Sequence, residues 1–131
     1  LNYRGEYDDF AIQGSLGYSY ADLTTGSLNQ YMVGLQGEFG GFILGGFWQN
    51  VDGGAGDRND YVVNGAYSTG RWTMGLGWAL VERSVGDNNK FAGWLTYALA
   101  PGVTVTSALE HNEQSNGADG TAALIYMGLS F

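Results

Sequence analysis

Hydrophobic and polar positions alternate along most of the chain with a period of two residues. The clearest case is the final segment, Thr121 to Phe131, in which Ile125, Met127 and Leu129 share one face and Tyr126 lies on the other. A β-strand with different surroundings on its two sides produces this alternation. We find no apolar stripe with helical spacing, so the sequence predicts an all-β protein.

Eight segments and part of a ninth are predicted to be strands, because all but one alternate and turn residues separate them. They are Leu1 to Tyr7, Phe10 to Tyr20, Gln30 to Phe39, Phe42 to Gln49, Tyr61 to Ser68, Arg71 to Arg83, Lys90 to Leu99, Val103 to Glu110 and the final segment. Leu1 to Tyr7 is predicted to be the end of a strand. Phe42 to Gln49 is apolar on both sides, so the alternation does not assign its faces.

Short and long links alternate between these segments. The short links are predicted two-residue turns at Asp8 and Asp9, Gly40 and Gly41, Thr69 and Gly70, and Pro101 and Gly102. The other links, ADLTTGSLN, NVDGGAGDRN, SVGDNN and HNEQSNGADG, are longer, polar and rich in acidic residues. Short turns at one end and longer loops at the other are typical of an antiparallel up-and-down β-barrel that spans an outer membrane.

Composition agrees with a sheet protein and excludes several functions. The chain has 23 Gly, nine Tyr, four Trp, one Pro and no Cys, which is a composition dense in aromatic rings and turns. The absence of Cys excludes a disulfide framework and a thiolate metal site. The formal net charge is −8 with only five Lys and Arg residues, so a nucleic-acid partner is not expected. No apolar run is long enough for a membrane-spanning helix.

The distribution of charge predicts which face meets lipid. A soluble barrel needs charge on its outer face, but the face opposite the large apolar residues is mostly Gly, Ala, Ser and Thr with few charges. We therefore expect the apolar face to meet lipid and the small polar face to line the lumen. Rings at the strand ends are then predicted to form two interfacial girdles: Tyr20, Tyr61, Tyr67, Trp72, Tyr97 and Phe131.

Small residues on the inner face also predict a wide barrel. The interior of a closed eight-stranded barrel is filled by its own side chains, and the residues assigned to the inside are too small to fill it. A wider, wet pore needs more strands than this chain supplies. Residues 1–131 are therefore expected to be a single β-barrel domain or its C-terminal portion, with the other half preceding Leu1.

Three segments in order resemble the C-terminal half of the general porins of alphaproteobacteria. They are NDYVVNGAYSTGRWTMGLGWA (Asn59 to Ala79), WLTYALAPGVTV (Trp94 to Val105) and GTAALIYMGLSF (Gly120 to Phe131). In that family a strand of the form GxSYSTGPWTxGLGY precedes YxLGPGVTL and a final strand that ends in Phe. Arg71 stands where the family often has Pro. The similarity is good over residues 59–131 and only compositional before them.

This resemblance implies a sixteen-stranded, trimeric outer-membrane porin of a Gram-negative bacterium. Such a porin is a passive diffusion channel for ions and small hydrophilic solutes, not an enzyme, and needs no cofactor. The constriction would be formed by a loop in the other half. The resemblance also implies that the barrel-assembly machinery recognises the terminal strand, with Tyr126, Leu129 and Phe131 as the assembly signal. The alternation itself predicts that the Phe131 ring faces lipid, in register with Leu129, Met127 and Ile125.

Polar residues on the inner face are the candidates for lining the pore, where fixed charges set ion preference. They are Arg4, Gln13, Gln36, Glu38, Asn64, Arg71, Arg83 and Glu110. Gln13, Gln36, Glu38, Asn64 and Glu110 are expected on the wall. Arg71 follows a tight turn and Arg83 ends a strand, so both are expected closer to the rim.

Two further groups of residues are candidate sites. Asp52, Asp57 and Asp60 could bind calcium in an external loop, although their spacing does not match a GGxGxD repeat and a solvated acidic loop is the commoner outcome. His111 is the only histidine. Ser107 lies about 13 Å along the same strand, too far to act with it as a nucleophile. Ser84 is an alternative nonlocal partner, but a histidine at a loop edge without a catalytic role is the commoner outcome.

Two other functions stay open from the sequence. One is a small outer-membrane barrel of about eight strands that acts in adhesion or surface structure through its acidic loops, and a closed barrel formed by this chain alone would favour it. The other is a soluble β-barrel that binds a ligand inside.

Overall fold

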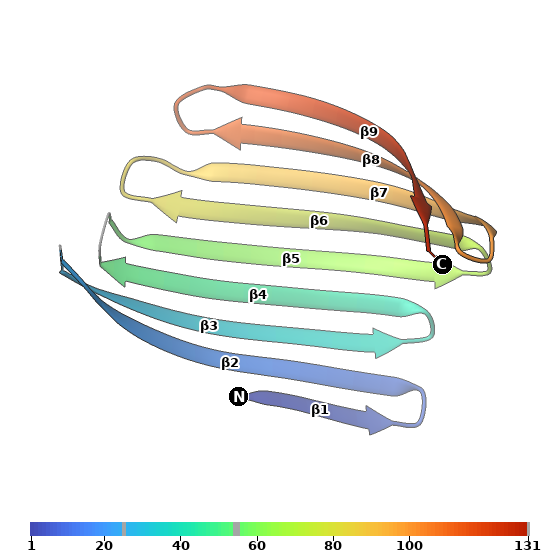
Figure 1. The fold of residues 1–131 in the computed structure, drawn as a ribbon, viewed down its shortest axis with the longest axis horizontal. Coiled ribbons are helices and arrows are strands. Elements are labelled where there is room, and N and C mark those ends of the chain that lie inside the picture. Colours follow the sequence, from blue (N-terminus) through green and yellow to red (C-terminus); the bar gives the residue numbers. More distant parts are fainter. Residues whose placement is uncertain (25, 54–55, 131) are drawn as a thin grey trace.

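The structure is a computed structural model that describes residues 1–24, 26–53 and 56–130. It is a single antiparallel sheet whose nine strands follow one another in chain order (Figure 1). The strands are β1 (Asn2–Tyr7), β2 (Phe10–Leu23), β3 (Gly26–Phe39), β4 (Phe42–Gly53), β5 (Arg58–Thr69), β6 (Trp72–Arg83), β7 (Asn88–Ala100), β8 (Val103–Gln114) and β9 (Asp119–Leu129). The predicted all-β class and the strand count, with a short first strand, are confirmed.

The sheet does not close on itself. Strand β1 pairs only with β2, and β9 pairs only with β8, so both are edge strands in the described part of the chain. Figure 1 shows β1 and β9 at opposite sides of the curved sheet. The closed small barrel that would have favoured the adhesion hypothesis is therefore absent from the described residues. The described residues contain no helix that is long and apolar enough to cross a membrane.

The links at one end are shorter than predicted, because the strands continue into the polar segments. Strand β2 runs to Leu23 and pairs there with Gly26 of β3, so the predicted link ADLTTGSLN is mostly strand. Strand β4 likewise continues to Gly53, and β5 begins at Arg58. The alternation of apolar residues ends where the strands leave the apolar band. It therefore could not detect these extensions.

The predicted tight turns are present at the other end, with one shift. Gly40 and Gly41 join β3 to β4 with φ angles of +54° and +83°, a conformation that glycine adopts at little cost. Thr69 is the last residue of β5 and pairs with Trp72, so the next turn consists of Gly70 and Arg71 and not of Thr69 and Gly70.

The register separates the residues into two faces. Directly paired residues lie on the same side of a sheet, so the face can be followed from strand to strand. One continuous row on the apolar face consists of Phe10, Phe39, Phe42, Tyr67 and Met74. Following this row also assigns the segment that the sequence left open. The apolar face of this segment carries Phe42, Leu44, Gly46 and Trp48. The small polar face carries Ile43, Gly45, Phe47 and Gln49.

Aromatic rings form two bands on the apolar face. At the short-turn end, the rings of Phe42 and Tyr67 have centroids 4.3 Å apart, and those of Trp72 and Tyr97 are 4.5 Å apart. Toward the other end, Tyr18 and Tyr31 lie 5.1 Å apart. Phe10 and Tyr18 are separated by eight residues of β2, about 27 Å along a strand. A tilted strand of this length spans the apolar band of an outer-membrane barrel.

No hydrophobic side chain in the described residues is buried. A single-layer sheet in water needs a second layer to cover its apolar face, and none is present here. In β3 the apolar-face residues Tyr31, Val33 and Leu35 are exposed, whereas Met32 and Gln36 on the other face are partly covered. Curvature of the sheet toward the small polar face produces this difference.

Candidate functional site

Five of the predicted pore-lining residues lie on one continuous row of paired residues. The row crosses all nine strands, from Arg4 on β1 to Ala122 on β9. Its members are Arg4, Gln13, Gln36, Gly45, Asn64, Gly77, Ala92, Glu110 and Ala122. We call this row the polar belt. Every residue between its polar members is Gly or Ala, so no large side chain covers the polar groups.

Charged side chains on the same face are mostly paired. Lys90 Nζ lies 2.8 Å from Glu110 Oε1, and Arg4 Nε lies 2.9 Å from Glu6 Oε1. Gln36 donates a 2.9 Å hydrogen bond to Glu38. These pairs are partly exposed, so each contributes at most about 1 kcal/mol to stability. Their main effect is to leave a wall with both signs of charge close together.

A further pair lies closer to the long-link end. Arg58 Nε donates to Asp60 Oδ1 at 2.6 Å, and Asp60 is one of the few buried residues of the described chain. Arg83 is paired in register with Arg58 on the same face. No carboxylate of the described residues forms an ion pair with Arg83.

Arg71 and Glu38 occupy different places from the polar belt. Arg71 lies in the turn between β5 and β6, where its guanidinium donates a 3.3 Å hydrogen bond to the carbonyl of Leu99. It is therefore a rim residue and does not project from a strand of the wall. Glu38 lies one row nearer to the short turns than the polar belt, opposite Ala11 and Ile43.

The structure adds residues that the sequence reasoning did not select. Lys90, Arg58 and Glu6 share the small polar face with the predicted set. The alternation in the sequence indicates the face of all three residues. They are close to predicted strand ends, however, where a charged residue is usually solvated. Trp94 also lies on this face, paired with Gly75, and is not among the predicted site residues.

The three carboxylates considered for calcium are not brought together. Asp52 is on the apolar face at the end of β4, whereas Asp60 is on the small polar face and pairs with Arg58. Asp57 hydrogen-bonds Asp52, and this contact and the repulsion between the two charges raise the pKa of Asp52. No cluster of three metal-ligating side chains is present in the described ranges.

His111 lies on the apolar face near the long-link end of β8. Its Nδ1 is 2.8 Å from Thr121 Oγ1 on β9, and its Nε2 is 3.3 Å from Glu113 Oε1. Ser84 lies close to Gly56 in the link between β4 and β5. The structure therefore gives His111 partners other than either serine considered from the sequence.

The residues of the predicted assembly signal are only partly described. Leu129 ends β9 on the apolar face, and Tyr126 is on the small polar face opposite Thr106. Phe131 lies outside the described residues. Its predicted lipid-facing orientation therefore stays a prediction.

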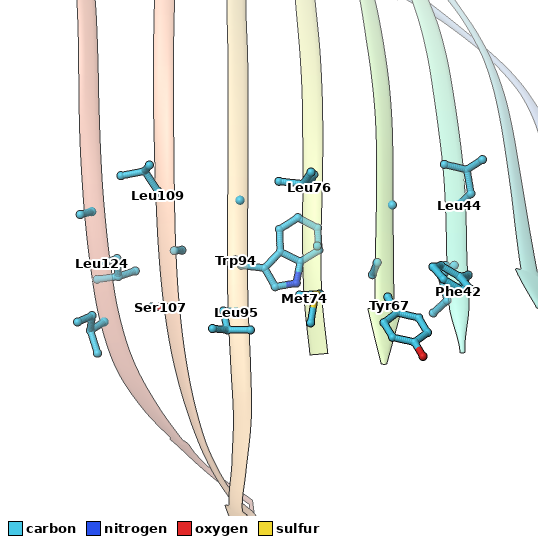
Figure 2. Close-up of a pocket in the computed structure, with 18 residues that line it drawn as sticks. Phe42, Leu44, Tyr67, Met74, Leu76, Trp94, Leu95, Ser107, Leu109 and Leu124 are labelled. Carbon is cyan, nitrogen blue, oxygen red and sulfur yellow. The ribbon is translucent and has the colours of Figure 1, made fainter. Parts of the chain in front are cut away.

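A hollow of about 1010 Å³ crosses β4 to β9 (Figure 2). Each of the six strands contributes three consecutive residues, among them Leu44, Leu76 and Leu109 with Gly65 and Gly93 between them. Its lining contains no Asp, Glu, Lys, Arg or His. The hollow is an apolar surface without groups for acid–base or metal chemistry.

Comparison with known proteins places this sheet in a family. A family model described as Gram-negative porin matches residues 1–117. No match is found in a search of curated proteins.

Solved porin structures have the same fold. An anion-selective porin from Comamonas acidovorans is 12% identical with a TM-score of 0.74, covering 99% of this chain and 48% of that one. A porin refined at 1.8 Å resolution is 15% identical with a TM-score of 0.77, covering 99% and 50%. OmpT from the outer membrane of Vibrio cholerae is 18% identical with a TM-score of 0.65, covering 99% and 48%.

These matches agree with an open sheet that is part of a larger barrel. The chain spans about half the length of the solved porins that it matches. The family model covers most of the chain, including strands β1 to β8 with every polar residue of the polar belt. The chain therefore belongs to the Gram-negative porin family, whose members lie in the bacterial outer membrane.

Proposed function

We propose that this chain forms part of the wall of a water-filled channel for passive diffusion of ions and small hydrophilic solutes. The observation that carries the proposal is the polar belt, a row of polar side chains separated only by Gly and Ala on the face opposite the aromatic bands. A row of this kind offers hydrogen-bonding groups to passing solutes without filling the lumen.

The charges support a wet environment for this face. Its strands carry the bases Arg4, Arg58, Arg83 and Lys90 and the acids Glu6, Glu38, Asp60 and Glu110. A basic residue that faces lipid at the bilayer midplane costs about 2–4 kcal/mol. On the apolar face, acidic residues occur only toward the long-link ends of the strands, beyond the aromatic bands. Only the orientation with the small polar face toward the lumen and the apolar face toward lipid therefore places these charged residues in water.

The two free edges support a larger barrel. Backbone groups at an open sheet edge have no partners inside a membrane, so β1 and β9 need further strands. We propose a sixteen-stranded barrel in which residues 1–131 form one continuous part. The proposed assembly is a homotrimer. A related OmpT structure is described as a trimer form, and this supports the proposal at the level of the fold.

The lumen residues of the proposed channel are those of the polar belt together with Glu38 and, at the mouth, Arg83. Arg71 belongs to the short-turn rim. We do not assign an eyelet residue to this half. No cofactor is proposed for the channel.

Reconstitution tests the channel directly. The full-length protein in planar bilayers should conduct KCl in discrete steps and should admit small uncharged sugars in a liposome-swelling assay. A correctly folded protein that inserts without conductance would refute the proposal and favour a surface or adhesion role.

The terminal residues are proposed to act in assembly. Tyr126, Leu129 and Phe131 would be recognised by the barrel-assembly machinery as an unpaired strand added to an open sheet edge. Deletion of Phe131 should lower the assembled fraction in the outer membrane and leave the conductance of each assembled pore unchanged, whereas Ser130→Ala should spare both. Normal assembly of the deletion variant would end this proposal.

A further inference from the structure

An apolar strip interrupts the polar chemistry of the proposed lumen wall. One row nearer to the short turns than the polar belt, the face carries only apolar residues from β4 to β9. These are Ile43, Ala66, Gly75, Trp94, Ala108 and Leu124, and they are paired in register across six strands. We call them the lumenal strip. Ile43 is 37% exposed and Leu124 is 57% exposed, which is unusual on a face that otherwise carries polar groups.

Trp94 is the largest member of the strip, and its position is set by glycine. The ring atoms of Trp94 occupy the space that a side chain at Gly75 would need, and its Cζ3 lies 3.9 Å from the Cβ position of Gly77. Figure 2 shows the indole of Trp94 lying across the neighbouring strand β6. A ring held against the sheet in this way has one broad face against the backbone and can offer the other to the lumen.

Polar groups border the strip on both sides. Toward the long links lies the polar belt with Glu110, whose carboxylate is 2.8 Å from the ammonium group of Lys90, one row farther toward the long links. Toward the short turns lies a row of hydroxyls, in which Thr96 and Thr106 are 2.8 Å apart. Glu110 on the belt and Ala108 on the strip are two residues apart, so the two rows are separated by about 7 Å along the strand.

The geometry points to a weak site for small zwitterions with an apolar side chain, the chemical class of aromatic and branched-chain amino acids; this inference rests on the proposed channel function. Glu110 would accept from the ammonium group and Lys90 would donate to the carboxylate. The apolar side chain would lie on the Trp94 ring, which leans over Gly75 of β6. The spacing of about 7 Å between adjacent same-face rows suits a molecule whose charged groups and side chain are separated by a few bonds. Both charges of the pair are used, so a zwitterion fits better than a simple anion or cation.

Conductance block tests the inference with the full-length protein in planar bilayers. Phenylalanine added to a KCl solution should reduce the conductance at millimolar concentrations, and glycine should not. Trp94→Ala should raise the half-blocking concentration of phenylalanine about three- to tenfold, the range expected for the loss of one aromatic contact. Trp94→Phe should retain most of the block, and Glu110→Gln should weaken it. Leu76→Ala, on the opposite face, is the matched control and should leave the block unchanged.

Three results separate the outcomes. Absence of KCl conductance would overturn the proposed function itself. Normal conductance with equal effects of phenylalanine and glycine would overturn the zwitterion site and leave the channel intact. Block that is unchanged in Trp94→Ala would show that phenylalanine binds elsewhere, which also overturns the site.

Discussion

At the scale of single residues, glycine decides where the large side chains of the wall can lie. Trp94 lies over Gly75, and Leu76 leans toward Gly93, whose Cβ position is 3.3 Å from Leu76 Cδ2. In both cases a large residue uses space that its paired neighbour leaves empty. Close packing of this kind within one sheet compensates in part for the absence of a buried core.

Substitution of Gly75 should therefore destabilise the wall. Gly75→Ala places a methyl group in the space of the Trp94 ring, and overpacking of this kind costs about 1–3 kcal/mol. Gly46→Ala is the matched control, because its nearest neighbour is an ordinary 3.6 Å contact with the carbonyl of Val62. Urea titration of the protein in lipid vesicles, followed by tryptophan fluorescence, measures both. Equal midpoints for the two variants would contradict the packing described for Trp94.

At the scale of strands and turns, the apolar alternation marks the membrane-embedded part of each strand. It predicted the strands well from Phe10 to Tyr20 and from Trp72 to Leu80, where one face is apolar. It did not predict the continuation of β2 to Leu23 or of β4 to Gly53. Both faces are largely polar in these extensions, so the side chains do not alternate. The strands continue there because the backbone hydrogen bonds continue, and these do not depend on side-chain type.

The turn between β3 and β4 should depend on each of its glycines to a different degree. Gly41→Val combines a φ of +83° with a Cβ position 2.6 Å from the carbonyl oxygen of Ser68, and such strain costs about 1–3 kcal/mol. Gly40→Asn should be tolerated, because asparagine adopts the left-handed conformation and no atom lies within 4 Å. The folded fraction of each variant can be measured by heat-modifiable gel mobility. A folded fraction for Gly41→Val equal to that of Gly40→Asn would contradict the turn geometry.

At the scale of the whole molecule, the sequence predicted the class, the two faces and the porin family resemblance, because each depends on periodicity and on turn residues. The polar residues Gln13, Gln36, Asn64 and Glu110 were each predicted to line the wall. Their position on one row could not be predicted, because it depends on the register of eight strand pairs. Arg71 lies at the rim as expected, but in the turn and not at the start of β6. Asp52 and Asp60 lie on opposite faces. Both outcomes depend on register, since a shift of one residue moves a side chain into a turn or to the other face.

The central claim is that the small polar face is wet and the apolar face meets lipid. Single-cysteine labelling in the membrane-embedded full-length protein tests it most directly, since this chain contributes no Cys of its own. The test uses adjacent positions that differ only in face: Gln36, Asn64 and Glu110 against Leu35, Val63 and Leu109.

A charged, water-soluble thiol reagent should label cysteine at positions 36, 64 and 110 at least about tenfold faster than at 35, 63 and 109, because a thiol needs water to ionise and react. Fluorophores at 35, 63 and 109 should be quenched by nitroxide-labelled lipids. The opposite pattern, with fast aqueous labelling at 35, 63 and 109 and lipid quenching at 36, 64 and 110, would contradict the assignment of the two faces and the channel built on it.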